Sequence, residues 1–296
     1  MKKGISDHRV AYLGPPATHT HLACLKYFGH SAHMIPKDGL QEVFETVEKG
    51  EVNDGVIPVE NSIEGSVNRT LDLFIESEVK ICGEIMIQVS HDLLSQNGRR
   101  ETIHKVFSHP QALEQCRNWL RKNLPHIDMI ETSSTAKAAQ MATEDYESAA
   151  IASSLAAHFY RLKIIESQIE DYSFNYTRFG VIGQQIAGRT GNDKTSILFS
   201  IPHVPGSLHG VLKLFSDQSI NLTKIESRPI KQKPWEYIFF LDFEGHITDT
   251  PIHETLTRLK EEVPFFKLLG SYGRSTSPSN QWWRSVHIGE EYPSPG

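Results

Sequence analysis

The chain has 296 residues, of which 39% are hydrophobic and 22% are charged, and these proportions are typical of a globular protein with two or three domains. Thirty Lys and Arg against thirty-six Asp and Glu give a net charge of -6 at pH 7. Because no basic tract stands out, we expect no nucleic acid partner. No apolar run is long enough to cross a membrane, and residues 1–9 contain no apolar secretion segment, so we expect a cytoplasmic protein without membrane contact.

The cysteines and one group of histidines are the candidates for a metal or redox site. Cys24, Cys82 and Cys116 are odd in number and far apart, which argues against disulfides or a CxxC site and favours small core residues. Four histidines near the N-terminus resemble a ligand group: His19, His21, His30 and His33. However, no carboxylate or cysteine stands at ligand spacing, and side chains two residues apart diverge on a helix. We therefore expect no metal.

Strand and helix patterns alternate from residue 8 to residue 185. Residues 10–13 form an apolar run that ends at a Gly-Pro-Pro turn, and Thr18 can cap the helix that follows. After a helix over 40–49 and a strand over 52–57, a polar loop with Asn61 and Ser62 precedes a helix through residues 71–75. Backbone N–H groups at helix starts stabilise anions, so both turns are candidate anion sites. Capping of the next helix by Ser62 or Ser66 is an equal alternative.

The alternation starts again near residue 90. Strand patterns over 81–89, 106–107, 127–130 and 149–152 are interleaved with helix patterns over 111–120, 135–142 and 154–159. This repeat predicts two subdomains built of parallel α/β layers, roughly 8–90 with 168–185, and 91–167. Ligands lie beyond the carboxyl ends of such strands. We therefore expect the residues that follow predicted strands to collect in a cleft between the lobes: Thr18, Asn61, Ser62, Ser108, His109 and Ser153.

The stretch Asn175-Tyr176-Thr177-Arg178-Phe179 is the strongest candidate site in the chain. The guanidinium of Arg178 is a planar fork that pairs with a carboxylate, and the Thr177 hydroxyl both donates and accepts hydrogen bonds. Together the two side chains suit a small substrate with two carboxylates. The alternative is a strand edge at which they only face water.

The pattern changes after a polar, Gly-bearing linker over 186–193. Residues 194–273 predict the order strand, helix, strand, strand, helix, strand, with a turn from Pro229 to Pro234 between the central strands. This is the ferredoxin-like α+β arrangement. Residues 274–296, which include Trp282-Trp283, are expected to form a loosely ordered tail or a hydrophobic anchor on a partner subunit.

Several motifs in this order resemble the prephenate dehydratases, a family in which a catalytic domain precedes a regulatory ACT domain. The similar stretches are Leu13-Gly14-Pro15 with Thr18, Pro58-Val59-Glu60-Asn61-Ser62 with Gly65, Ser108-His109-Pro110-Gln111-Ala112-Leu113, Ser134-Thr135-Ala136, and Asn175 with Thr177-Arg178-Phe179. The chain departs from the family at Ala17 and Arg161, where Gly is usual, and at His19, where an aromatic residue is common. No chorismate mutase helix precedes Val10, so we expect a monofunctional enzyme.

The resemblance implies a two-lobed catalytic domain, like that of periplasmic binding proteins, over 8–185 and an ACT domain over 194–273. It implies the decarboxylating dehydration of prephenate to phenylpyruvate in L-phenylalanine biosynthesis, without a cofactor, in a homodimer or homotetramer. The alternatives are arogenate as the substrate, or a small-molecule sensor without catalysis.

The same resemblance implies site residues in both domains. We expect catalysis by Thr177, Asn61 and Ser62. We expect substrate binding by Thr18, Glu60, Asn175, Arg178 and Phe179, the last as an apolar wall against the ring. Feedback by L-phenylalanine is expected at Gly206, Ser207 and Leu208 together with Glu226, Ser227, Arg228 and Pro229. For this region the alternative is a dimerisation module that binds no ligand.

Overall fold

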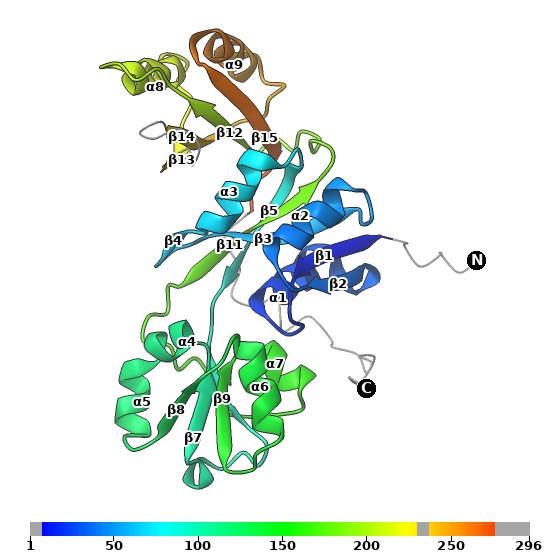
Figure 1. Cartoon of the computed structure of the whole chain (residues 1–296), viewed down its shortest axis with the longest axis vertical. Helices are drawn as coiled ribbons and strands as arrows, with labels where there is room; N and C mark the ends of the chain where they lie inside the picture. The colour runs from blue at the N-terminus through cyan, green and yellow to red at the C-terminus, as the bar shows by residue number, and fades with distance from the viewer. Residues whose placement is uncertain (1–7, 230–236, 276–296) are drawn as a thin grey trace, which may run out of the picture.

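The computed structural model describes residues 8–229 and 237–275, which form three β-sheets with helices packed on them (Figure 1). The first sheet has the strand order β2-β1-β3-β11-β5, and β4 pairs with β3. Its strands are β1 (Arg9–Leu13), β2 (His33–Lys37), β3 (Asp54–Asn61), β4 (Gly65–Ser66), β5 (Lys80–Gln88) and β11 (Tyr176–Gly183). The chain leaves this lobe after β5 and returns to the middle of its sheet with β11.

Three helices and a short 3-10 turn accompany the first sheet: α1 (His19–Phe28), η1 (Gly29–Ser31), α2 (Leu40–Glu48) and α3 (Asn68–Glu76). In α2 the apolar side chains recur three and four residues apart, and Val43, Phe44 and Val47 are all buried. In α3 the same spacing buries Leu71 and Phe74. This stripe is what fixes each helix on the sheet.

The second lobe contains the sheet β10-β6-β9-β7-β8. Its elements are β6 (Asp92–Ser95), η2 (Arg100–Thr102), β7 (Lys105–Ser108), α4 (Pro110–Gln115), α5 (Arg117–Asn123), β8 (Asp128–Glu131), α6 (Thr135–Thr143), β9 (Ser148–Ala152), α7 (Ser154–Phe159) and β10 (Lys163–Glu166). Alanines of α6 and β9 are fully buried, and their small side chains allow the helix to lie close to the sheet. The helix predicted over 111–120 is two helices that meet at Cys116.

Both sheets are mixed, so the expectation of parallel layers is wrong in part. Strand β1 runs parallel to β2 and β3, but β11 runs antiparallel to both of its neighbours, β3 and β5. In the second sheet β7 is parallel to β8 and β9, whereas β6 is antiparallel to β9 and β10. Apart from the short β4, which pairs antiparallel with β3, the antiparallel pairs involve strands that follow or precede a crossing between the lobes. A local strand and helix pattern carries no information on where the chain re-enters a sheet.

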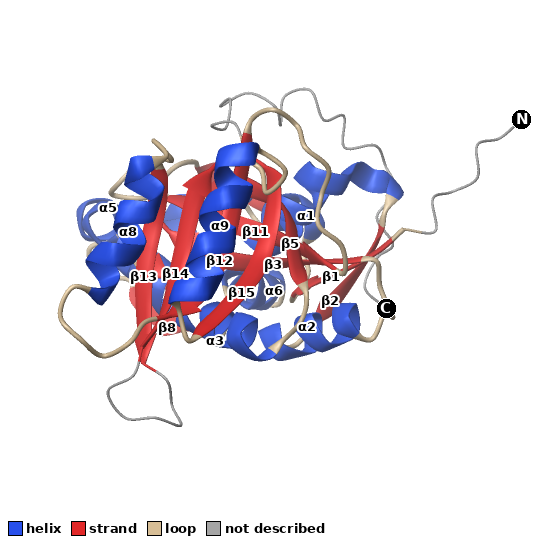
Figure 2. Ribbon diagram, turned by 90° about the horizontal axis from the view of Figure 1, so that it is seen from above, coloured by secondary structure: helices blue, strands red, loops and turns tan. Residues whose placement is uncertain are grey.

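The third sheet has the order β13-β14-β12-β15, and all of its pairs are antiparallel. Its elements are β12 (Asp193–Ser200), α8 (Ser207–Asp217), β13 (Leu222–Pro229), β14 (Tyr237–Glu244), α9 (Thr250–Glu262) and β15 (Phe265–Gly273). Figure 2 shows both helices on one face of this sheet. The expected ferredoxin-like arrangement is confirmed. The turn from Pro229 to Pro234 and the tail with Trp282-Trp283 lie mostly or wholly outside the described residues.

The face of the third sheet away from its helices packs against the first lobe. Leu198, Ile238 and Phe240 of the sheet share one apolar cluster with Leu71 and Phe74 of α3. Strand β15 also approaches β5 closely, because a Cβ added at Gly270 would lie 2.0 Å from the carbonyl oxygen of Ile81. The third sheet and the first lobe therefore share a continuous core. Within the described residues, no helix is both long and apolar enough to cross a bilayer.

Candidate active site

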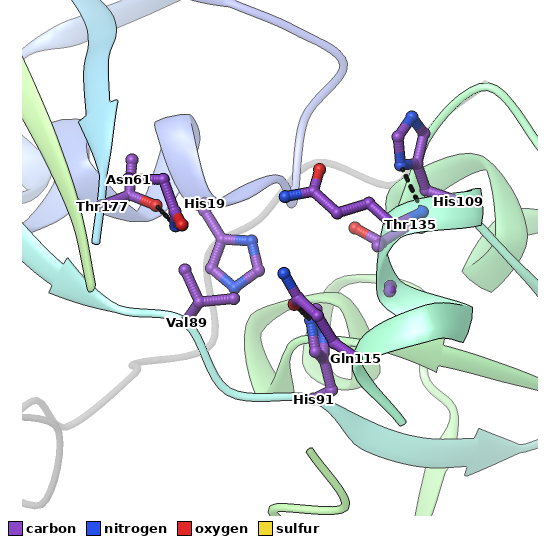
Figure 3. A pocket seen from close by; sticks show the side chains of 10 residues that line it. His19, Asn61, Val89, His91, His109, Gln115, Thr135 and Thr177 are labelled. Carbon is purple, nitrogen blue, oxygen red and sulfur yellow. Dashed lines mark hydrogen bonds between the residues drawn. The ribbon is translucent and has the colours of Figure 1, made fainter. Parts of the chain in front are cut away.

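A pocket of about 140 Å³ lies between the two lobes (Figure 3). The first lobe and the crossing after β5 contribute His19, Asn61, Val89, His91 and Thr177, and the second lobe contributes His109, Gln111, Ala112, Gln115 and Thr135. A cleft between the lobes therefore exists as predicted, and its walls come from six separate stretches of the chain. Of the residues expected to collect in it, Asn61 and His109 line the pocket, whereas Thr18, Ser62, Ser108 and Ser153 do not.

Asn61, at the end of β3, fixes the Thr177 hydroxyl of the adjacent strand β11. Its amide nitrogen donates to Asn175 Oδ1 at 2.7 Å and to Thr177 Oγ1 at 3.0 Å. Its amide oxygen accepts the backbone N–H groups of Ile63 and Glu64 at 2.9 and 3.1 Å, which fixes the nitrogen end toward Thr177. Because Thr177 Oγ1 accepts the bond from Asn61, its own O–H hydrogen can be donated into the pocket.

Ser62 secures the backbone beside the pocket. Its hydroxyl accepts the N–H of Tyr176 at 2.9 Å and donates to the carbonyl oxygen of Phe174 at 3.1 Å. The side chain is exposed and is not among the residues that line the pocket. Helix α3 is not capped by Ser62 or Ser66, because its N-cap is Val67, which makes no side-chain cap bond. A direct catalytic role for Ser62 stays a prediction.

Two helix N-termini, one from each lobe, border the pocket. Thr18 caps α1 as predicted, since its hydroxyl accepts the N–H of His21 at 3.4 Å and donates to Pro15 O at 3.0 Å. His19, which lines the pocket, is the first residue of α1. Thr135, on the opposite wall, is the first residue of α6. The positive ends of two helix dipoles therefore face the same space.

The departures from the family at positions 17 and 161 coincide with left-handed backbone. Ala17 has φ 68° and Arg161 has φ 57°, and this is the region that favours Gly. Ala17 is nevertheless held in place, because its N–H donates to His21 Nδ1 at 3.0 Å and its carbonyl oxygen accepts from Ser153 at 3.3 Å. The turn before α1 thus keeps its shape without a glycine.

His91 and Gln115 form a pair that the sequence analysis did not anticipate. His91 Nε2 lies 2.8 Å from Gln115 Oε1. Burial is the main cause that lowers the pKa of His91, although Gln115 and Glu170 act in the opposite direction. A neutral imidazole that faces a carbonyl oxygen must donate through Nε2–H. Gln115 Oε1 is thereby occupied, and Figure 3 shows the amide nitrogen directed away from His91 toward the middle of the pocket.

His19 and His91, two of the histidines that line the pocket, are neutral near pH 7 because burial lowers the pKa of both. Burial and the neighbouring His91 lower the pKa of His19 to about 4. The two rings lie edge to face with their centroids 5.9 Å apart. Across residues 8–229 and 237–275, no group of three or more His, Cys, Asp or Glu side chains is arranged to hold a metal ion.

The structure does not bring Arg178 to the pocket, which corrects the expected contact with substrate. Successive side chains of a strand point to opposite faces, so Thr177 faces the pocket and Arg178 faces the third sheet. The guanidinium pairs with Glu60 at 2.7 Å, Glu84 at 3.2 Å and Asp242 at 2.8 Å. Arg178 is only 6% exposed. Its charge is directed to protein carboxylates, on the far side of the strand from the pocket.

Four other expected substrate contacts are also absent from the lining of the pocket. Thr18 lies just before the lining residue His19 and caps α1. Glu60 faces the third sheet and pairs with Arg178 and with Lys224 of β13. Phe179 is 2% exposed and packs in the core of the first lobe, so it cannot serve as a wall against a ring. Asn175 is 1% exposed and acts on the site through its hydrogen bond from Asn61.

The predicted effector residues fall into two groups. Gly206 has φ 86° and precedes α8 as its N-cap, Ser207 donates to Val204 O at 2.9 Å, and Leu208 packs on the core of the third sheet. On β13, Glu226 accepts from Ser66 at 3.0 Å and Arg228 pairs with Asp72 of α3 at 3.0 Å. Ser227 and Pro229, which alternate with them, are exposed. Glu226 and Arg228 therefore contact the first lobe in the single chain.

Two family models match the chain, one after the other. The model of the family described as prephenate dehydratase matches residues 10–187, and the ACT domain model matches residues 195–261. The bifunctional chorismate mutase/prephenate dehydratase of Aquifex aeolicus is 51% identical over 267 residues, covering 90% of this chain and 74% of that protein. The prephenate dehydratase of Methanocaldococcus jannaschii is 38% identical over 270 residues, covering 89% of this chain and 97% of that protein.

A solved structure agrees with both sequence comparisons. The prephenate dehydratase of Arthrobacter aurescens, in complex with L-Phe, superimposes with a TM-score of 0.83 at 33% identity, covering 90% of each chain. The expected architecture, a two-lobed catalytic domain like that of periplasmic binding proteins followed by an ACT domain, is thereby confirmed. The first family model spans more than half of the residues, and the M. jannaschii enzyme is matched over nearly its full length. This chain belongs to the prephenate dehydratase family.

Proposed function

We propose that the protein converts prephenate to phenylpyruvate, and that its ACT domain provides feedback by L-phenylalanine. The observation that carries the catalytic part is the Asn61–Thr177 hydrogen bond of 3.0 Å at the edge of a pocket shared by both lobes. It leaves a hydroxyl hydrogen available at one defined place. The proposal is further supported by the family to which the chain belongs.

The reaction needs help at one bond only. The ring carboxylate leaves as carbon dioxide, its bonding electron pair enters the ring, and the C–O bond at the opposite carbon breaks with its pair on the departing hydroxide. Aromatisation drives both cleavages, and solvent supplies the proton that turns hydroxide into water. Thr177 is too weak an acid to give up its proton outright, so it acts as a hydrogen-bond donor to the leaving oxygen.

An uncharged pocket is suited to this chemistry. Of the described residues that line it, none is an Asp, Glu, Lys or Arg. The two substrate carboxylates would be held by the helix starts at His19 and Thr135 and by neutral amides, which replace part of the lost hydration without a strong ion pair. A ring carboxylate that is weakly held in this way is released more readily as neutral carbon dioxide.

Gln115 supplies a second donor for the same substrate. Its oxygen is occupied by His91, so its NH₂ group is presented to the pocket. We propose that the Gln115 NH₂ group donates a hydrogen bond to either the leaving oxygen or the side-chain carboxylate of prephenate, and that His91 holds the amide in this orientation. Neither role needs a charged imidazole.

The same lining favours prephenate over arogenate. Arogenate carries an ammonium group where prephenate carries a keto group, and a buried ammonium needs an acceptor that is preferably charged. The described lining residues include no carboxylate. The keto acid therefore fits the pocket better.

The regulatory proposal places L-phenylalanine between two copies of the ACT domain. Strand β13 is an edge strand that exposes Ile225, and an edge strand is a natural place for a second copy to pair. We propose a homodimer or homotetramer in which the turn at Gly206 of one copy meets β13 of another. A cytoplasmic location is consistent with three cysteines that are all unpaired.

One assay tests this function. Purified protein is incubated with prephenate, and phenylpyruvate is followed with and without L-phenylalanine, with arogenate as a parallel substrate. We expect product from prephenate and a changed rate with the amino acid. If neither substrate gives product, the catalytic proposal fails and the alternative is a small-molecule sensor. If product forms at the same rate with and without L-phenylalanine, only the regulatory part of the proposal fails.

A further inference from the structure

The residues next to Asn61 and Thr177 in the chain are held by the ACT domain. Glu60 precedes Asn61 on β3, and Arg178 follows Thr177 on β11. Both side chains lie on the face of the first sheet that is opposite to the pocket, where Glu60 meets Lys224 and Arg178 meets Asp242. The two strands that bear the central hydrogen bond of the site therefore carry the regulatory domain on their other face.

Six charged side chains form this contact, which we call the interface network: Glu60, Glu84 and Arg178 from the first lobe, and Lys194, Lys224 and Asp242 from the third sheet. All but Glu60 have side chains that are 12% exposed or less. Besides the pairs of Arg178, Lys194 Nζ lies 2.8 Å from Glu84 Oε2. Water is thus largely excluded from the network.

The two halves of the interface network are complementary in charge. The first lobe contributes one positive and two negative groups, a sum of -1, and the third sheet contributes two positive and one negative, a sum of +1. The network is neutral only when the halves are together. Removing one partner from a buried set leaves an uncompensated charge, which is strongly unfavourable. The position of the ACT domain is therefore tied to that of Arg178 and Glu60.

Asp242 is the best anchored member on the ACT side. Ser196 Oγ donates to Asp242 Oδ1 at 2.6 Å, and Ser196 Oγ lies 2.7 Å from the hydroxyl of Tyr272. Burial by itself would raise the pKa of Asp242, but Arg178 and Ser196 outweigh it, so the pKa lies below its usual value. The carboxylate stays charged, and three strands of the third sheet hold it in place.

We propose that the interface network sets the positions of Thr177 and Asn61, so that Arg178 and Glu60 are positioning residues through which the ACT domain acts on the pocket. This inference rests on the proposed function. Strand β11 lies between β3 and β5, and its register with β3 is irregular between Arg178 and Phe179. Such an irregularity disrupts the ladder locally and bends the strand, which sets the direction of nearby side chains, and it lies directly beside the residues concerned.

The predicted effector residues give the network a route to the ligand. Every second side chain of β13 in this region lies on the same face and contacts the first lobe, namely Lys224, Glu226 and Arg228. A ligand that draws Glu226 or Arg228 away would shift β13 and with it the Lys224 contact to Glu60. Because Glu60 directly precedes Asn61 on β3, a shift of Glu60 would also move Asn61.

The test is Asp242→Asn, with Asp217→Asn as the matched control. Asn keeps the shape of the side chain and the bond from Ser196, while Arg178 retains Glu60 and Glu84, so the protein remains folded. Asp217 is a half-exposed partner of Lys213 within α8, so the control makes the same chemical change in the same domain away from the interface network. Both variants and the parent are compared for kcat, KM for prephenate, and amide hydrogen exchange of β11.

For Asp242→Asn we expect kcat to fall about 10- to 100-fold with KM within twofold, because a misplaced donor costs turnover more than binding. Amide exchange should rise in β11 and at the end of β3, and Asp217→Asn should change neither. Parental kcat together with unchanged exchange in β11 would overturn the proposal, as would a rise confined to the ACT domain. If the parent itself has no turnover, the proposed function fails, and the exchange data still decide whether the network positions β11.

Discussion

The two faces of strand β11 are opposite in electrostatic character. On one face Thr177 lies at a pocket whose described lining residues include no Asp, Glu, Lys or Arg, and on the other Arg178 lies among three carboxylates. Thr177 and Arg178 are nevertheless consecutive residues of the same strand. One face of the first sheet thus carries the hydrogen-bond donors of the pocket, and the opposite face carries the ion pairs that hold the ACT domain.

This difference shows how one short motif serves two purposes. A charged pocket would bind the substrate carboxylates more tightly, but it would also stabilise the ring carboxylate that must be lost. Placing the guanidinium on the other face keeps the pocket neutral and gives the ACT sheet a buried charge to pair with. Changes at Thr177 and at Arg178 therefore test the two faces separately.

The largest expected effect is on the charged face, from Arg178→Met. This change leaves Glu60, Glu84 and Asp242 without their shared cation in a buried setting, and removal of one partner from such a set costs about 3–5 kcal/mol. Urea denaturation should therefore show a loss of this size in the free energy of unfolding. Arg178→Lys, which keeps the charge but not the planar fork, should lose less. A stability within about 1 kcal/mol of the parent would contradict a structural role for Arg178.

On the neutral face, Thr177→Ala should lower kcat about 100- to 1000-fold, the range seen when one donor to a developing negative charge is removed. Its unfolding free energy should be close to that of the parent, because the hydroxyl is only one partner of the Asn61 amide. Thr177→Ser keeps the hydroxyl and should recover most of the turnover. Normal kcat for the alanine variant would exclude Thr177 as the donor.

The buried histidines also predict a pH dependence of stability. Burial lowers the pKa of His19 and His21 from 6.5 to about 4, and lowers that of His91. Between these values the unfolded chain binds more protons than the folded one, so their contribution is complete above pH 6.5 and is lost as the pH falls toward 4. Asp92, whose pKa burial raises to about 6, acts in the opposite direction but is one group against three.

The measurement is the melting temperature from pH 8 to pH 4. We expect a plateau at the alkaline end and a decrease below about pH 6.5. The variant His19→Asn should show a shallower decrease. A melting temperature that rises as the pH falls from 6.5 to 4 would mean that these histidines are not held neutral.

Part of this site followed from the sequence, and particular residues show why the rest did not. Asn61 and Thr177 were identified because polar side chains followed predicted strands and matched family motifs, and the cleft followed from where such strands end. Gln115 lies inside a predicted helix, where a polar residue normally faces water. His91 comes just after a strand, with no partner nearby in the chain. Only the crossing between the lobes brings these two side chains together.

The misassignment of Arg178 has a different cause. Thr177 and Arg178 were both directed at the substrate, although successive residues of a strand point to opposite faces. Alternation alone therefore indicated that one of the two leaves the pocket. The partner of Arg178 could not be predicted from the sequence, because Asp242 lies in another domain and pairs with Arg178 only when that domain is docked. The same holds for Glu60 and Lys224.

The smallest expected effect separates burial from charge. Lys213 and Asp217 pair at 2.7 Å on the surface of α8, with side chains 59% and 49% exposed. An exposed pair of this kind contributes about 0–1 kcal/mol, since water already solvates both groups and salt screens them. Asp217→Asn should therefore leave the free energy of unfolding within about 0.5 kcal/mol of the parent and leave kcat unchanged. Urea denaturation at low and high salt measures this directly, beside Asp242→Asn in the same domain. If Asp217→Asn and Asp242→Asn lowered the free energy of unfolding equally, stability would depend on the charge itself and not on its burial at the contact. The contrast between the two faces of β11 would then be unsupported.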